Sequence, residues 1–175
     1  MKITATLALS KFVELAKTQD KKSLLDIGCG KHQPHCAKFR EQKTFKEIST
    51  CDFFNNNDYK GLFTEIDFEG KQFDAVWCAH VLEHQENVGA FLRKIHSVTK
   101  EGGLVAITVP PMKHNIVGGH LTLWNIGLLY YNIILAGFDC SNAFHKQYNY
   151  DQSIILNKKT IKNMPALNYD CGDIE

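Results

Sequence analysis

The chain has 175 residues, of which 44% are hydrophobic and 22% are charged, and its formal net charge is +1. This length and composition fit one globular domain with a hydrophobic core. The near-neutral charge gives no electrostatic reason to expect a nucleic acid or a membrane surface as partner. The six cysteines form no C-x-x-C pair and the first residues do not read as a leader. We therefore expect reduced thiols in a cytoplasmic protein.

Helix and strand patterns alternate along the first part of the chain. Apolar residues recur at helical spacing near the N-terminus, within a predicted helical segment 1–20. A short apolar run then ends in glycine, as in a strand buried on both faces. The predicted elements are a helix over 5–17, a strand over 23–27, a helix over 35–43, a strand over 47–51 and a weakly patterned strand near 62–66.

The second part continues the alternation and completes one domain over residues 1–158, followed by a tail over 159–175. Strands separated by helices predict an α/β fold with a mostly parallel, doubly wound sheet and helices on both faces. Ligands of such sheets bind at the carboxyl ends of the strands. The predicted elements are a strand over 73–79, a helix over 86–99 stopped by a glycine pair, a strand over 104–109, a flap and helix over 110–136 with the helix itself over 121–136, and two strands between 139 and 157.

The loop after the first strand reads LLDIGCGKHQPHC. Asp26 ends the strand, and Gly28 and Gly30 let the backbone approach a ligand closely. The stretch is not G-x-G-x-x-G, because Gln33 stands at the last position, so a dinucleotide cradle is weakly supported. Three interpretations stay open at this point: a cofactor cradle, a tight turn, or a metal site made of His32, His35 and Cys36.

Two further acids follow later strands. Asp52 ends the second strand, where a carboxylate can accept hydrogen bonds from both ribose hydroxyls of a nucleoside. Asp67 stands beside Phe68, a pair suited to an adenine amino group and its ring. Each acid alone is compatible with an ordinary surface position, but together they fall on successive loops of one sheet edge.

With these pieces the chain resembles the class I S-adenosylmethionine-dependent methyltransferases, particularly their small-molecule group. The motifs that carry the resemblance are LLDIGCG (24–30), CD (51–52), ID (66–67), FDAVWCAHVLEH (73–84), KEGGLVAITVP (100–110) and AGFD with SIIL (136–139, 153–156). The resemblance implies a single Rossmann-like sheet of seven strands in the order 3-2-1-4-5-7-6, with the last strand antiparallel.

The resemblance also implies roles for individual residues. Asp26, Gly28 and Gly30 would line the methionine part of S-adenosyl-L-methionine, and Asp52 would hold its ribose. The adenine would lie against Asp67 and Phe68, and the reactive end against Cys78 and Ala79. His32 departs from the family, which often has a third glycine there, and its bulk is expected at the lip of the cofactor pocket.

The segment His80-Val-Leu-Glu83-His84 also reads as H-x-x-E-H, a metalloprotease pattern. Two histidines four residues apart on a helix could share a metal. No third ligand is evident nearby, and the segment directly follows a buried strand. The family resemblance implies a turn at the cofactor's edge in this place, and we expect no metal.

Residues 112–124 form a glycine-hinged segment after the fourth strong strand, as expected of a flap over a substrate. A hydroxyl acceptor needs a base, and histidine suits that role. His120 is the first candidate because it lies in the flap, and His84 is the second because it lies near a strand end. His80 and His114 are further candidates.

These observations predict methyl transfer to a hydroxyl or amine of a small molecule, such as a sugar or another metabolite, by a monomer or dimer. A nucleic-acid base is disfavoured, because Val109-Pro110-Pro111 does not match the proline motif of amino-directed DNA methyltransferases. The alternative is a methyltransferase-like fold that binds the nucleoside cofactor or a partner without catalysis. A nicotinamide oxidoreductase is disfavoured by the missing phosphate glycine.

Overall fold

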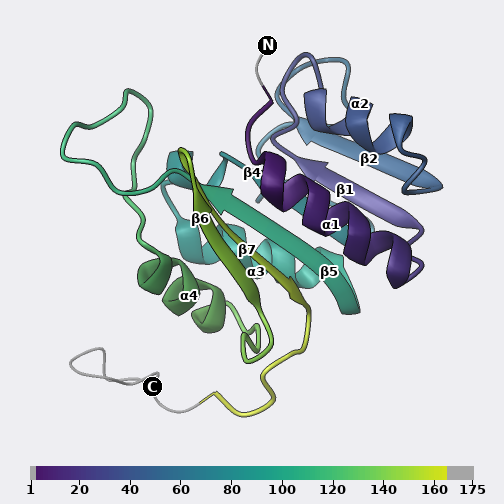
Figure 1. Ribbon diagram of the computed structural model, residues 1–175. Coiled ribbons are helices and arrows are strands. Elements are labelled where there is room, and N and C mark those ends of the chain that lie inside the picture. The colour runs from purple at the N-terminus through teal and green to yellow at the C-terminus, as the bar shows by residue number, and fades with distance from the viewer. Residues whose placement is uncertain (1–2, 165–175) are drawn as a thin grey trace.

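The computed structural model describes residues 3–164, which build one seven-stranded sheet in the order β3-β2-β1-β4-β5-β7-β6 (Figure 1). Strand β7 runs antiparallel to both of its neighbours, β5 and β6, and every other neighbouring pair runs parallel. The fold and the strand order predicted from the sequence are therefore confirmed. The strands are β1 (Ser23–Ile27), β2 (Glu47–Asp52), β3 (Tyr59–Lys60), β4 (Phe73–Ala79), β5 (Thr99–Val109), β6 (Phe144–Tyr148) and β7 (Asp151–Asn157).

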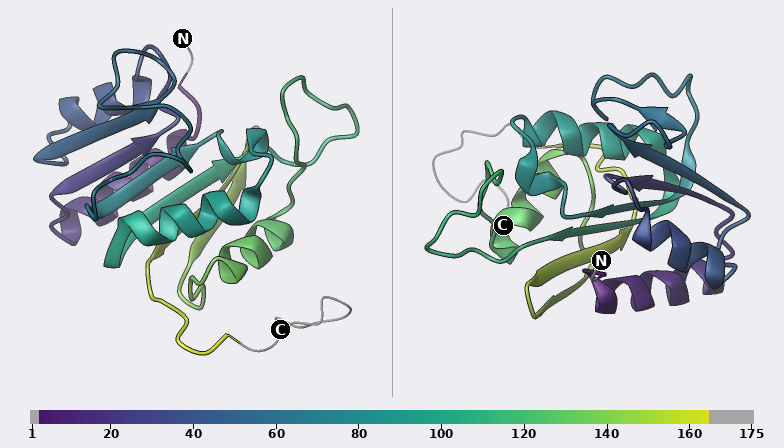
Figure 2. Two further views of the ribbon diagram at one scale, coloured as in Figure 1. Left: turned by 180° about the vertical axis from the view of Figure 1, so that it is seen from behind. Right: turned by 90° about the horizontal axis from the view of Figure 1, so that it is seen from above.

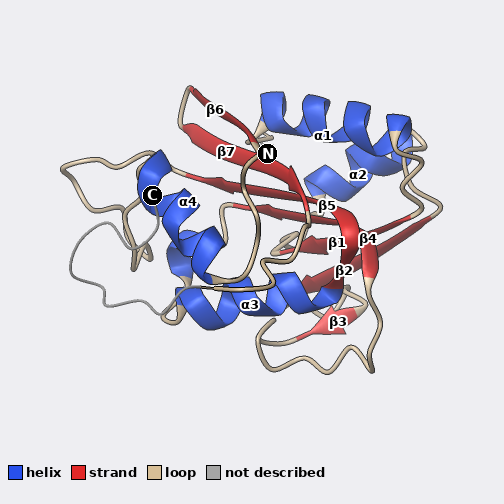
Figure 3. Cartoon of the chain, turned by 90° about the horizontal axis from the view of Figure 1, so that it is seen from below, coloured by secondary structure: helices blue, strands red, loops and turns tan. Residues whose placement is uncertain are grey.

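Helices cover both faces of the sheet (Figure 3). Helices α1 and α2 pack on one face, and α3 and α4 pack on the other. The views in Figure 2 show the same layering from behind and from above. The helices are α1 (Thr6–Thr18), α2 (Pro34–Glu41), α3 (Val88–Val98) and α4 (Ile126–Leu135), with a short 3₁₀ helix, η1 (Leu82–His84).

Side chains along each strand alternate between the two faces of the sheet, so the hydrophobic core has two parts, one on each face. Ala75 and Trp77 of β4 pack under α1 and α2, whereas Val76 and Cys78 pack under α3 and α4. All four are essentially buried. Residues that alternate in this way are apolar on both sides, which is why the strand reads as a continuous hydrophobic run in the sequence.

Helix α1 begins without a capping side chain of its own. The Ala5 amide donates instead to Asp151 Oδ2 at 3.1 Å, and the Ala8 amide donates to the Tyr148 hydroxyl at 3.0 Å. Two amides at the start of the helix are thus satisfied by the hairpin of β6 and β7. The N-terminal helix and β7 are thereby joined close to the carboxyl ends of the strands.

Three predicted elements need correction. The weak strand expected near 62–66 is a turn, in which the Glu65 and Ile66 amides donate to Leu62 O, and the third strand lies just before it, at Tyr59–Lys60. The last predicted helix begins at Ile126 rather than at residue 121. The glycine pair lies within β5, where the register shifts, and helix α3 has already ended at Val98.

The late start of α4 has a tertiary cause. The Leu121 and Thr122 amides donate to Glu83 O at 2.8 and 3.2 Å, so this part of the chain stays extended against η1. Asn125 then caps the helix, because its side chain accepts from the Leu128 amide at 2.8 Å. The flap, residues 112–124, therefore projects as a long loop that is anchored at its end (Figure 1).

The chain leaves the sheet after β7 and returns along the end of α4. The Asp139 amide donates to Lys159 O, and the Ile161 amide donates to Gly137 O. Residues 159–164 of the predicted tail are thus attached to the domain, and the remainder of that predicted tail lies outside the described residues. Over residues 3–164, none of the helices has the length and apolar character needed to cross a lipid bilayer.

Candidate functional site

The carboxyl ends of β1, β2 and β4 open into a pocket of about 240 Å³. It lies at the topological switch point of the sheet, because the chain runs from β1 to β2 and β3 on one side and then continues with β4 and β5 on the other. Ligands usually bind at this position in such sheets. Its wall is mainly apolar, with one carboxylate and two imidazoles. The lining residues are Ile27, Gly28, Cys51, Asp52, Phe53, Gly61, Leu62, Phe63, His80, Val81, His84, Gln85 and Phe91.

The glycine turn forms the floor of this pocket. Gly28 has a φ of +69°, and its amide donates to Cys51 O at 2.8 Å, which extends the pairing of β1 with β2 by one residue. A Cβ at Gly28 would lie 2.1 Å from Val81 Cγ2. Only glycine fits here, because both the backbone conformation and the packing of Val81 exclude a side chain.

Asp52 stands at the end of β2 and lines the pocket, as predicted for the ribose acid. Its Oδ2 accepts from the Gly30 amide at 2.8 Å, and its Oδ1 accepts from the Phe53 amide at 2.6 Å. Each carboxylate oxygen has capacity for a second donor. The carboxylate is therefore held in place by backbone while it can still accept from a ligand.

Side-chain amides connect the glycine loop with the loop after β2. Gln33 donates to Asn57 Oδ1 and to Asn56 O, and Asn56 donates to Lys31 O. The asparagine cluster that marks a turn in the sequence thus also fixes the distance between two walls of the pocket. Phe53, which immediately follows Asp52, is 62% exposed at the rim.

Several predicted cofactor residues lie off the pocket wall. Phe68 is buried and packs on Tyr59 and Phe73, with ring centroids 4.6 and 6.0 Å away. Asp67 accepts from the Glu69 amide in a turn. Cys78 and Ala79 are buried between sheet and helices. The last residues of β1 and β2 contribute to the wall, and most of the other lining residues lie in the segments that follow the strands.

His32 also lies outside the pocket. It is exposed and faces a separate surface hollow beside Ile3 and Pro34, so the crowding expected at the pocket lip is not seen. His35 contacts Thr4 O through Nε2, and the Cys36 thiol donates to Asp26. These side chains diverge, and the metal site considered for His32, His35 and Cys36 is not formed.

Asp26 lies beneath the glycine loop and is fully buried. Burial raises the pKa of its carboxyl to about 7, against the opposing effect of the Cys36 thiol, which donates to Oδ2 at 3.0 Å; the nearby Asp52 raises it further. A carboxyl in an unfolded chain has a pKa of about 4. The folded state therefore binds one more proton than the unfolded state between these two values, and stability falls as the pH rises through this window.

We expect Asp26→Asn to remove this component of the pH dependence, because the amide has no charge to bury. The free energy of unfolding of the variant, relative to that of the natural protein, should rise by about 2–3 kcal/mol from about pH 5 to about pH 8. Urea unfolding of both proteins across this range measures the difference. Parallel stability curves would show that Asp26 is ionised throughout.

His80 follows β4 with a φ of +56°, a conformation uncommon for residues other than glycine. Its Nε2 lies 2.7 Å from Asp151 Oδ1, and its Nδ1 lies 3.2 Å from Glu83 Oε1. Burial lowers the pKa of His80, but the hydrogen bonds with Glu83 and Asp151 outweigh it, and the pKa is raised. His80 thus joins the pocket to β7 and, through Asp151, to the start of α1.

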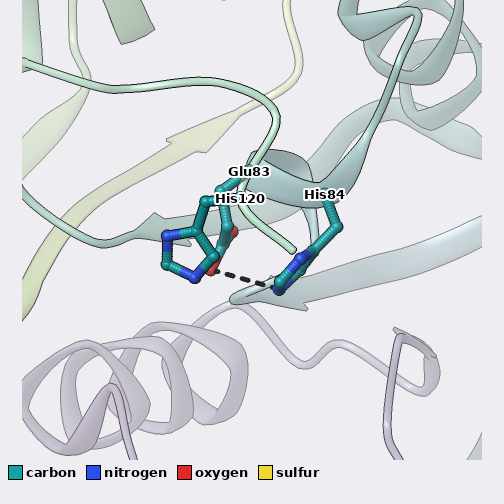
Figure 4. Close-up of side chains that lie close together, drawn as sticks. All are labelled: Glu83, His84 and His120. Atoms are coloured by element: carbon teal, nitrogen blue, oxygen red, sulfur yellow. Dashed lines mark ion pairs between the residues drawn. The ribbon is translucent and has the colours of Figure 1, made fainter. Parts of the chain in front are cut away.

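The two predicted histidines, His84 and His120, meet beside the pocket although they come from different segments. Their ring centroids are 4.9 Å apart, and both lie next to Glu83 (Figure 4). His84 Nδ1 donates to Gly119 O at 2.6 Å, which fixes the flap against η1. His84 lines the pocket, and His120 lines a neighbouring hollow under the flap. Sequence reasoning did not place Val81 or Phe53 on the pocket wall, although both lie within two residues of a predicted strand end, and it named His80 only as a possible base.

Solved structures that are similar to this chain include methyltransferases. Three solved structures superpose on the chain. A protein of Bacillus halodurans has 18% identity and a TM-score of 0.63, covering 79% of this chain and 72% of its own. The 1,6-didemethyltoxoflavin-N1-methyltransferase of Burkholderia thailandensis has 16% identity and a TM-score of 0.67, covering 89% and 80%. The N-methyltransferase NodS of Bradyrhizobium japonicum has 11% identity and a TM-score of 0.68, covering 87% and 86%.

Because these sequence identities are low, the superpositions establish similarity of fold alone. A search of curated protein sequences finds no match. The family described as "Methyltransferase domain" matches residues 3–131, which is more than half of the chain and includes the glycine loop, Asp52 and η1. The protein is therefore a member of this methyltransferase family.

Proposed function

We propose that the protein transfers a methyl group from S-adenosyl-L-methionine to a hydroxyl or amine of a small molecule. The observation that carries the proposal is the pocket in which Gly28 and the backbone-held Asp52 converge on one opening. Membership of the methyltransferase family supports it. The structures of two similar proteins contain S-adenosylhomocysteine, the demethylated product of this cofactor.

The residues present fit such a nucleoside. We assign Asp52 to the two ribose hydroxyls, which are donors, and the Gly28 turn with Asp26 beneath it to the methionine part. Phe53 and Leu62 are exposed apolar side chains on the pocket rim, and we assign the adenine ring to the space between them. Phe68 and Asp67, which the family resemblance suggested for the adenine, are not on this wall.

When bound, the cofactor supplies a methyl group on a sulfonium, which an acceptor takes by in-line displacement while the sulfur leaves as a neutral thioether. The protein then has to align the acceptor and, for a hydroxyl, accept its proton. His84 donates through Nδ1, so in the neutral imidazole the Nε2 beside the pocket is the nitrogen that can accept a proton. We assign His84 and His120 to the part of the site that would hold the methyl acceptor, with His84 nearer to the pocket.

Calorimetry with S-adenosylmethionine and S-adenosylhomocysteine tests the first step, and incubation of labelled cofactor with a panel of hydroxyl and amine metabolites tests the second. We expect both ligands to bind and label to reach at least one acceptor. Absence of binding by either ligand would overturn the proposal. Binding without transfer to any acceptor in the panel would favour the alternative function, nucleoside binding without catalysis.

A further inference from the structure

A cluster of three possible metal ligands lies between η1 and the flap (Figure 4). Glu83, His84 and His120 each offer one ligand atom, and these atoms all lie within 4.8 Å of one another. Glu83 Oε1 is 3.9 Å from His84 Nε2. Within residues 3–164 this is the one such group of histidine, cysteine and acidic side chains.

The buried carboxylate is incompletely satisfied by the protein. Glu83 is fully buried, and its Oε2 has no hydrogen-bond partner among the described residues. Its other oxygen, Oε1, lies 3.2 Å from His80 Nδ1 and is also the oxygen that lies 3.9 Å from His84 Nε2. An unpartnered carboxylate oxygen in the interior is costly, and a bound cation is one of the groups that satisfy it.

The histidines are oriented as metal ligands usually are. A ligating histidine commonly donates its second ring nitrogen to a carbonyl or carboxylate, which fixes the tautomer. His84 Nδ1 donates to Gly119 O at 2.6 Å, so in the neutral imidazole the lone pair is on Nε2, which lies 3.9 Å from Glu83 Oε1. The carbonyl that orients His84 belongs to the residue just before His120.

The position of His120 is set by the base of the flap. Leu121 and Thr122 donate backbone hydrogen bonds to Glu83 O, which holds the adjacent His120 over η1. The Gly118-Gly119 pair precedes it, and Gly119 has a φ of +82°. A metal about 2.1 Å from each ligand needs ligand atoms roughly 3–4 Å apart, so a movement of about 1 Å by the His120 side chain would complete the site.

We propose that Glu83, His84 Nε2 and His120 bind a divalent transition-metal ion such as Zn²⁺, Co²⁺ or Mn²⁺. Two imidazoles with one carboxylate, and positions left open, suit these ions better than Mg²⁺, which favours oxygen ligands and water. His80 is not in the ligand set, because its Nε2 contacts Asp151 and its Nδ1 contacts Glu83 Oε1.

Such an ion would change how the acceptor hydroxyl loses its proton. This consequence rests on the proposed methyl transfer. A metal at His84 Nε2 occupies the lone pair that would otherwise accept a proton. An acceptor hydroxyl on an open coordination position would instead have its own pKa lowered, and its proton would pass to solvent. The site would then select oxygen acceptors close to the pocket rim.

Metal binding itself is the test, and it needs neither the cofactor nor an acceptor. The full chain is stripped with a chelator, then titrated with Zn²⁺ by calorimetry and with Co²⁺ by visible absorption. We expect one equivalent to bind, and a Co²⁺ spectrum typical of mixed nitrogen and oxygen ligands. His120→Asn should weaken binding by at least about 10–100-fold, the range that loss of an outer-shell partner already causes.

His114→Asn is the matched control, since His114 is an exposed histidine of the same flap that is not in the cluster. It should bind Zn²⁺ like the natural protein. Equal affinity in the His120→Asn and His114→Asn variants would place the ion elsewhere, for instance on cysteines, and overturn the proposal. Absence of stoichiometric Zn²⁺ or Co²⁺ binding by the natural protein would also overturn it. Both outcomes are independent of whether S-adenosylmethionine binds.

Discussion

Gly28→Ala is expected to lower the free energy of unfolding by about 2–5 kcal/mol and to weaken cofactor binding. The left-handed backbone, with φ at +69°, costs a residue with a Cβ about 1–2 kcal/mol. The new methyl group would also lie 2.1 Å from Val81 Cγ2, and such overpacking costs about 1–3 kcal/mol. Denaturant unfolding measures the first effect, and calorimetry with S-adenosylhomocysteine measures the second.

Gly30→Ala separates the cost of the left-handed backbone from the cost of the contact with Val81. Gly30 has the same φ of +69°, but no atom lies within 4 Å of the position of its Cβ. We expect this variant to show the backbone cost alone, about 1–2 kcal/mol. Val81→Ala should relieve part of the defect of Gly28→Ala when the two are combined, because they share one contact. Equal destabilisation by the two glycine substitutions would show that the contact with Val81 has no energetic role.

Asp52→Asn is expected to weaken binding of S-adenosylhomocysteine about 10–100-fold and to lower the free energy of unfolding by about 0.5–1.5 kcal/mol, because one of the two backbone amides bound to the carboxylate also loses its acceptor. The amide keeps the shape of the carboxylate but replaces one acceptor oxygen with a donor, so one ribose hydroxyl loses its partner. Hydrogen bonds to charged groups contribute about 1.5–3 kcal/mol. The dissociation constant from calorimetry gives the result directly, and the unfolding curve shows that the fold is retained.

Asp67→Asn is the matched control, because it changes the other acid that the sequence singles out. Asp67 lies in a turn away from the pocket wall, and its carboxylate accepts from the Glu69 amide. We expect its dissociation constant to equal that of the natural protein. Weaker binding in Asp67→Asn, with Asp52→Asn unaffected, would reverse the assignment and place the nucleoside on the other loop.

The sequence placed the elements well where burial alone determines the pattern. The FDAVWCA run is apolar at every position but one, and the structure has β4 over the same residues, buried on both faces. The glycine turn and Asp52 were also predictable, because a buried strand followed by an acid or glycine is typical of the ligand-binding edge of a parallel sheet.

Residues whose role depends on a distant partner could not be placed in this way. Phe68 adjoins the acid Asp67, yet it packs on Tyr59 and Phe73, and neither contact has a sequence signature. Helix α4 starts late because Leu121 and Thr122 bond to Glu83 O. In both cases a contact between separate segments outweighs a weak local preference.

The sequence by itself determined the α/β class and, through its family resemblance, the strand order, and it predicted the glycine turn with Asp52 as part of the candidate site. The α/β class follows from the alternation of helix and strand patterns, and the glycine turn follows from a chain conformation that only glycine adopts readily. The tertiary structure alone decided that Glu83, His84 and His120 meet, since the flap returns to η1 through backbone hydrogen bonds. A local pattern encodes which residues are buried, but the approach of two loops depends on the folded chain between them.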